Sequence, residues 1–173
     1  MSKETKNFEN ITYLVGELKK TYKITVIIGA SLIASLLIYA LIVELIRSEF
    51  KPFPGFVTIT EIQVLRYIFY GFAFFEVIAV NILRPVLLKE RPTDDLNVFI
   101  LKLNRAAIIT YVFCEVPAIL GLVLFLLSGL HTDFYIFLFL SLILEILYFP
   151  KFKNWEEPIR NKIMSPKLEG GIK

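Results

Sequence analysis

The sequence predicts an all-α integral membrane protein, and composition, run length and backbone chemistry support this prediction. The chain of 173 residues is 56% hydrophobic, and its mean hydropathy of +0.66 is far higher than a water-soluble domain needs. Four apolar runs approach or exceed the roughly 17 to 25 residues that a helix needs to cross a bilayer. Because lipid cannot satisfy a bare backbone, spanning segments of this length form helices and not barrel strands.

These runs form one membrane domain over residues 24–149, with four transmembrane helices that we expect to pair as two hairpins. The connection "SGLHTD" between the last two runs is short. The fourth run is the shortest of the set. The predicted spans cover residues 24–46, 64–84, 106–128 and 134–149.

An amphipathic segment, residues 1–23, precedes the first span. Its apolar side chains recur at spacings of three and four, which places them on one stripe of a helix. Such a helix either lies along the cytoplasmic leaflet or packs on its own bundle. The residues of the stripe are Phe8, Ile11, Val15, Leu18 and Tyr22.

Lys and Arg residues predict the orientation. They are frequent in the N-terminal segment, in the middle connection and in the tail of residues 150–173, and "SGLHTD" has none. By the positive-inside rule, both termini are expected in the cytoplasm, and we expect the cell inner (plasma) membrane. In the tail, Trp155 is predicted to be an interfacial anchor.

Several classes of protein are not indicated. No basic run lies among aromatic residues, so we expect no nucleic-acid partner. The single cysteine, Cys114, excludes an intrachain disulfide, and no Cys/His spacing predicts a metal or a cofactor. No catalytic set or phosphate-binding loop is present, so we expect at most a subunit of an ion-translocating complex and not an enzyme.

Acidic residues inside the apolar runs are the most informative feature. Glu76 lies eight residues before Arg84, and Glu115 lies ten residues after Arg105. At ~1.5 Å per residue, the two carboxyl groups lie about 12 and 15 Å from the same boundary. Antiparallel spans therefore bring them to a similar depth, with Glu145 about one turn shallower.

A charge at that depth costs several kcal/mol, so a lone carboxyl is expected to hold its proton unless a cation compensates. Each of these acids is thus a candidate proton carrier. The alternative is a protonated carboxyl that only holds helices together. The predicted proton-binding residues are Glu115, Glu76 and Tyr111, with Glu145 and Thr110 as accessory residues.

Small residues occupy the face of the third span next to Glu115. They form a ridge that lets another helix approach closely. The predicted helix-packing residues are Cys114, Ala118 and Gly121.

The stretch "FCEVPAILGLVLFLL" resembles the ion-carrying helix of rotary ATPase c subunits (proteolipids), in which an acid is followed by A-I-x-G-L-[IV]. The resemblance implies that Glu115 is the proton-binding carboxylate of a homo-oligomeric ring. It also implies H⁺ and not Na⁺, because no Ser or Thr follows Glu115 directly. Unlike that family, this chain has a further span after the carboxylate helix.

Two functions are therefore expected. The first is a proteolipid-like membrane subunit that binds or translocates protons through an intramembrane carboxylate. The second is a non-catalytic scaffold or assembly subunit of a larger membrane complex. Both imply the lipid bilayer and either further copies of the chain or other membrane subunits as partners.

Overall fold

The computed structural model describes residues 3–57, 62–88, 96–153 and 155–157, and over these residues it contains helices and no strand. All four helices are long and apolar enough to span a membrane. This confirms the prediction of an all-helical, multi-pass membrane protein. The helices are α1 (Lys3–Glu49), α2 (Ile62–Leu87), α3 (Leu96–Ser128) and α4 (His131–Tyr148).

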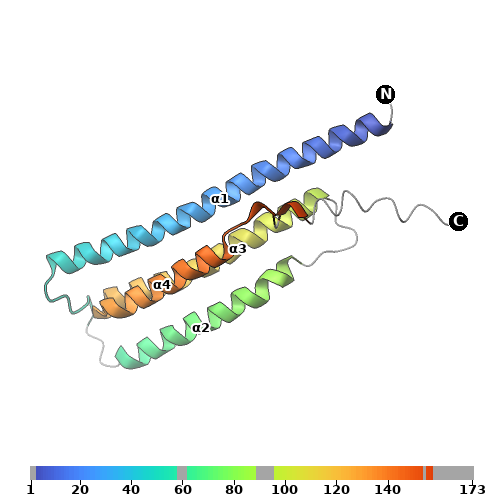
Figure 1. Cartoon of the computed structure of the whole chain (residues 1–173). Coiled ribbons are helices and arrows are strands. Elements are labelled where there is room, and N and C mark those ends of the chain that lie inside the picture. The colour runs from blue at the N-terminus through green and yellow to red at the C-terminus, as the bar shows by residue number, and fades with distance from the viewer. Residues whose placement is uncertain (1–2, 58–61, 89–95, 154, 158–173) are drawn as a thin grey trace.

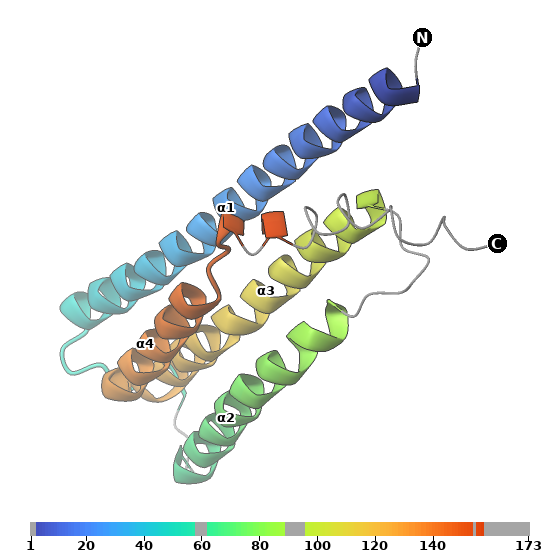
Figure 2. The ribbon, with the colours of Figure 1, turned by 45° about the vertical axis from the view of Figure 1, so that its right-hand side comes forward.

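The third helix lies at the centre of the bundle. It packs against each of the other three, and α4 also packs against α1. Successive helices run in opposite directions, and α1 and α2 lie on opposite sides of the α3 and α4 pair (Figures 1 and 2). We call the end where α1 begins and α4 finishes the terminal end, and the opposite end the loop end.

The first helix differs from its prediction. It continues without a break across the boundary expected at residue 23, and its apolar stretch extends over Val15–Glu49. No Pro or Gly occurs between Glu17 and Ile28, so nothing in the sequence stops or kinks the helix there. Residues 3–23 therefore continue the axis of the first span.

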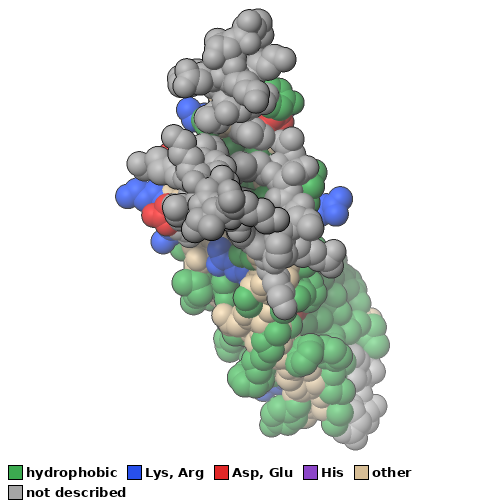
Figure 3. Space-filling view, turned by 90° about the vertical axis from the view of Figure 1, so that its right-hand side faces the viewer, with side chains coloured by type: hydrophobic (Ala, Val, Ile, Leu, Met, Phe, Trp, Pro, Cys, Tyr) green, Lys and Arg blue, Asp and Glu red, His purple; other side chains and the backbone are tan. Residues whose placement is uncertain are grey.

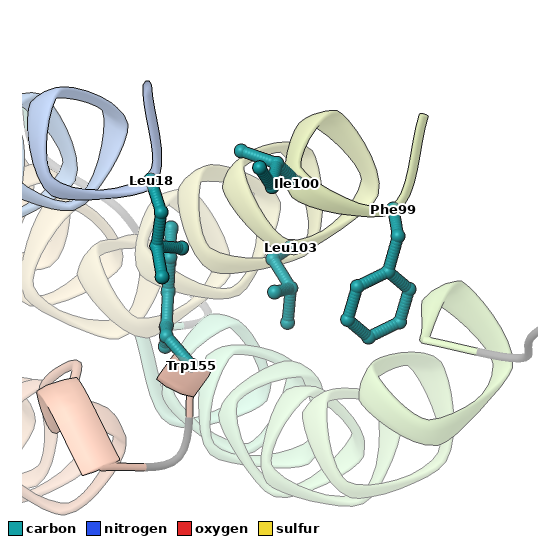
Figure 4. Close-up of a cluster of buried hydrophobic side chains, with 5 residues drawn as sticks. All are labelled: Leu18, Phe99, Ile100, Leu103 and Trp155. Carbon is teal, nitrogen blue, oxygen red and sulfur yellow. The ribbon is translucent and has the colours of Figure 1, made fainter. Parts of the chain in front are cut away.

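A cluster of buried side chains closes the terminal end (Figure 4). Tyr22 packs edge-on against Trp155, with 5.7 Å between ring centroids, and its hydroxyl donates to the Pro150 carbonyl at 3.1 Å. Trp155 is only 5% exposed, so the prediction that it is an interfacial anchor is wrong. The described residues that follow α4, 150–153 and 155–157, lead back to α3, and the indole is buried there. The cluster consists of Leu18, Phe99, Ile100, Leu103 and Trp155.

The small-residue ridge of α3 seats α4 of the same chain. A Cβ atom on Gly121 would lie 2.7 Å from the Cβ atom of Phe137, so only glycine lets the two helices come this close. Ala118 is fully buried, and its amide donates to the Ser141 hydroxyl at 2.8 Å. Cys114 is also fully buried, in a cluster with residues of α2 and α4. The face that carries these residues is therefore turned away from lipid.

The first connection docks on the loop end of α3. The amide of Phe56 donates to the Leu126 carbonyl at 2.8 Å, and the amide of Val57 donates to the Leu127 carbonyl at 3.3 Å. Gly129, with φ of 71°, lies directly against the backbone of Phe53, where a side chain would collide. This docking caps the end of α3 and starts α4 in a fixed direction.

Charged and apolar surfaces are separated along the bundle. Figure 3 shows Lys and Arg side chains near the terminal end and a mostly hydrophobic surface on the rest of the visible face. Large aliphatic and aromatic side chains of α1 and α2, such as Leu37, Phe74 and Phe75, are more than 60% exposed. In a bilayer these side chains face lipid.

Candidate functional site

Glu115 lies near the middle of α3 and faces α1. Its Oε1 atom accepts hydrogen bonds from the Ser35 hydroxyl at 2.5 Å and from the Tyr39 hydroxyl at 2.7 Å. Ser35 and Tyr39 are one helical turn apart, so they project from the same side of α1. The carboxyl group is half-buried and is held from two points of a neighbouring helix.

The Ser35 hydroxyl is close to a second acceptor. Its oxygen also lies 2.6 Å from the Leu32 carbonyl of its own helix. A hydroxyl group has one proton to donate and two lone pairs to accept with. Ser35 therefore cannot donate to Leu32 and to Glu115 at the same time.

Glu145 lies on α4 and is the most deeply buried carboxyl group among the described residues, at 1% exposure. Neither of its oxygens has a hydrogen-bond partner in the part of the chain that the structure describes. It lies close enough to Glu115 for the two carboxyl charges to repel each other. The residue predicted as accessory, and not Glu76, is thus the acid that interacts electrostatically with Glu115.

Tyr111 lies one turn below Glu115 on α3 but does not bond to it. Its ring packs against α1 at Gly29, where a Cβ atom would lie 3.0 Å from the Tyr111 Cζ atom. The phenol oxygen is buried and has no hydrogen-bond partner among the described residues. The absence of a side chain at Gly29 leaves room for this ring between α3 and α1.

Thr110 lines a small cavity nearer the terminal end. The cavity has a volume of about 30 Å³, and Arg84 and Tyr148 share its wall with Thr110. A polar space of this size holds one water molecule. Thr110 is 5% exposed, and Tyr111, the next residue of α3, does not line the cavity.

Glu76 does not join Glu115. It lies on α2, is 9% exposed, and lines a cleft between α2 and α3 together with Phe113 and Val116. Counting residues predicted that the two acids lie at a similar depth. Depth does not determine how each helix is rotated about its axis, and so does not determine which neighbour each acid faces. Glu115 faces α1, and the cleft with Glu76 lies on the side of α3 that faces α2.

The structure contains a second buried carboxyl group on α4 that sequence reasoning missed. Asp133, which is 2% exposed, accepts bonds at Oδ1 from Arg66 Nε at 3.1 Å, Arg66 Nη2 at 2.8 Å and the Tyr70 hydroxyl at 2.7 Å. Arg66 and Tyr70 are four residues apart on α2. This i, i+4 pair of donors was the signal available in the sequence.

Ser35 and Tyr39 were also missed. They are polar residues four apart in the first span, with a third hydroxyl at Ser31 one turn earlier. Ser31 is exposed, and within the described part of the chain its hydroxyl donates to its own helix, at the Ile27 carbonyl. The sequence could therefore have shown a polar face on the first span, but not which of its hydroxyl groups meets an acid.

Metal binding has no support from the described residues. No three His, Cys, Asp or Glu side chains in the described ranges lie close enough together to hold an ion. Glu115 instead lies beside two hydroxyl groups, which exchange protons.

Comparison with known proteins finds no family model that matches this chain, no matching curated protein and no matching solved structure.

Proposed function

We propose that this chain is a proteolipid-like membrane subunit that binds protons at the Glu115 and Glu145 carboxyl pair. The observation that carries the proposal is the position of Ser35, whose single hydroxyl proton faces two acceptors at 2.6 and 2.5 Å. The protonation state of Glu115 decides how these three groups bond.

With Glu115 ionised, the hydroxyl groups of Ser35 and Tyr39 both donate to the carboxylate, and the Leu32 carbonyl loses its bond to Ser35. With Glu115 protonated at Oε1, the acid donates to Ser35, and Ser35 donates to Leu32. Each state satisfies a different set of bonds, and a single proton separates them. The site therefore has two bonding patterns of comparable completeness, as a reversible proton site requires.

The second acid supports the same interpretation. Glu145 has no cation and no hydrogen-bond donor nearby among the described residues, and an uncompensated charge in this position is costly. Both bonds to Glu115 within the described residues end on Oε1 and none on Oε2. The charge of each carboxyl group disfavours ionisation of the other, so the pair is most stable with at least one of the two protonated.

Two elements of a proposed route lie between the pair and the terminal end. They are the water-sized cavity at Thr110 and the unpartnered phenol of Tyr111, the next residue of α3. Water and hydroxyl groups in sequence are the elements of a proton relay. We propose that protons enter from the terminal end by this route.

The proposal includes a topology. The Lys and Arg side chains near the terminal end (Figure 3) support a cytoplasmic position for both termini under the positive-inside rule. The four helices then cross the membrane as two hairpins, and we place them in the cell inner (plasma) membrane. As the proteolipid resemblance implies, the chain is proposed to assemble with copies of itself or with other membrane subunits.

Infrared difference spectroscopy tests proton binding directly. Purified protein in liposomes is titrated between acid and alkaline pH, and the carbonyl stretch of protonated carboxylic acid is followed. We expect a reversible band that disappears in Glu115→Gln and changes in frequency in Glu145→Gln. Glu44→Gln is the control, because Glu44 is exposed and bonds to Tyr135 and Arg47 away from the site. A wild-type band that persists in Glu115→Gln would overturn the proposal.

Proton flux separates binding from translocation. Liposomes with an internal pH dye receive a potassium diffusion potential, and acidification is compared between wild type and Glu115→Gln. Flux in the wild type and none in the variant supports translocation. If the infrared band is intact but no flux is observed, the chain binds protons and requires a partner subunit to transport them.

The exposed aromatic face of α2 favours a second candidate function, a non-catalytic scaffold for a larger membrane complex. Tyr67, Phe72 and Phe74 are 72%, 61% and 71% exposed, and such surfaces can pack against other subunits. In this case Glu115→Gln has no effect on assembly, and alanine substitutions on this face prevent co-purification of a partner. Native mass spectrometry of wild type and variants distinguishes the two functions.

A further inference from the structure

We propose that the cleft between α2 and α3 is a binding site for a lipophilic organic cation, with Glu76 as its counter-ion. The cleft has a volume of about 340 Å³, within the range of roughly 300 to 1,000 Å³ for small-molecule sites. It is separate from the Glu115 and Glu145 pair, and the proposal does not depend on proton binding there.

The floor of the cleft carries an acid without a partner. Glu76 is 9% exposed, and its Oε2 atom is buried and has no hydrogen bond within the described residues. No Lys or Arg lines the cleft. The ionised carboxylate therefore has no complementary charge in the lining of the cleft, and a bound cation would supply it.

Aromatic rings surround this acid. Phe69, Phe72, Phe75 and Phe113 line the cleft, together with aliphatic side chains. The faces of aromatic rings attract cations, and the attraction is strongest where water is excluded. Four phenyl groups beside one carboxylate match a cation whose charge is surrounded by hydrocarbon.

The cleft opens toward the lipid. Phe72 and Phe75 at its rim are 61% and 66% exposed, so a ligand can enter sideways from the bilayer. Glu76 lies ~21 Å from the Ile62 end and ~17 Å from the Leu87 end of α2. A phospholipid headgroup stays at the membrane surface, so the occupant is a smaller molecule that carries its charge into the apolar layer.

Equilibrium binding of tritiated tetraphenylphosphonium to the purified full-length chain in detergent tests this site. We expect saturable binding and an affinity at least about tenfold weaker in Glu76→Gln. Glu44→Gln is the control, because it removes a carboxyl group that lies outside both the cleft and the proposed proton site, and it should bind like wild type. Neutral triphenylphosphine oxide should fail to compete, since it offers the same rings without the charge.

A second variant, Phe75→Leu, allows the proposal to be tested even if Glu76→Gln does not fold. Phe75→Leu removes one ring from an exposed position, and we expect an affinity about threefold weaker, with an unchanged elution volume on size-exclusion chromatography. Wild-type affinity in both cleft variants would overturn the proposal. Displacement by triphenylphosphine oxide as effective as by the unlabelled cation would also overturn it, because it would show a site for neutral aromatic molecules.

Discussion

Helix α4 carries two buried carboxyl groups whose surroundings are opposite. Asp133 and Glu145 are 2% and 1% exposed and lie twelve residues apart, or ~18 Å along the helix. Asp133 accepts three bonds from Arg66 and Tyr70. Glu145 accepts none among the described residues and has another acid, Glu115, as its charged neighbour.

This difference teaches that burial alone does not identify a functional acid. A carboxylate paired with a guanidinium group and a phenol is compensated in its charged form, and it ties α4 to α2. A carboxyl group without donors gains stability only from a proton or a ligand. The partners of a buried acid, and not its depth, separate a structural role from a chemical one.

The largest expected effect on stability comes from removing the cation that compensates Asp133. Arg66→Met leaves Asp133 buried and without its cation, and we expect a loss of about 3 kcal/mol in the free energy of unfolding. Asp133→Asn should cost less, about 1 to 2 kcal/mol, because Arg66 is 37% exposed and can turn to water. Reversible unfolding in mixed detergent micelles measures both, and the opposite order would contradict the asymmetry.

The next effect tests whether the ridge on α3 positions α4, and with it both acids. Gly121→Ala places a Cβ atom 2.7 Å from Phe137, and such overpacking costs about 2 kcal/mol. Gly71→Ala is the control, since nothing lies within 4 Å of its new Cβ atom and alanine favours a helix by up to about 1 kcal/mol. The same unfolding assay applies, and equal stability of the two variants would show that α4 does not pack closely against Gly121.

Replacing Glu145, the acid without a partner, should raise the free energy of unfolding instead of lowering it. Glu145→Leu removes a buried polar group that has no partner among the described residues, and we expect a gain of about 1.5 kcal/mol in stability. Asp133→Leu, which strands Arg66 and Tyr70, should lose stability in the same assay. A destabilised Glu145→Leu variant would indicate that Glu145 has a structural role, as Asp133 does, and would contradict the difference between the two acids.

The smallest effect concerns the donors around Glu115. Tyr39→Phe removes one hydrogen bond at 2.7 Å, and the expected loss is about 1 kcal/mol. Tyr13→Phe, at a position on the same helix that is 63% exposed, should change stability by less than about 0.5 kcal/mol. Equal values for the two variants would mean that the bond from Tyr39 does not stabilise the fold.

Much of the architecture was readable from the residues. The predicted spans fall within or close to the four helices, because apolar runs of this length have few other stable forms in lipid. The ridge of Cys114, Ala118 and Gly121 was also visible as a pattern. The continuation of α1 through residue 23 was also readable, since no Pro or Gly interrupts the sequence there. The burial of Trp155 was not, since it depends on contacts with Leu18 of α1 and with α3.

The candidate site was readable only in part. Glu115 stood out as an acid inside an apolar run, but Glu76 was given the role of neighbour that Glu145 has in the structure. Ser35 and Tyr39, which bond to Glu115, come from a helix about 80 positions earlier in the chain. Local spacing carries no information about which helix face will meet which.

The sequence by itself determined that four apolar helices form, and how far each acid lies along its helix, because both follow from composition and from the rise per residue. Only the tertiary structure decided which acids have partners. The rotation of each helix about its axis is set by side-chain packing, such as the contact of Phe137 with Gly121 and of Tyr111 with Gly29. That rotation places Asp133 beside an arginine, Glu115 beside two hydroxyl groups, and Glu145 beside no donor in the described part of the chain.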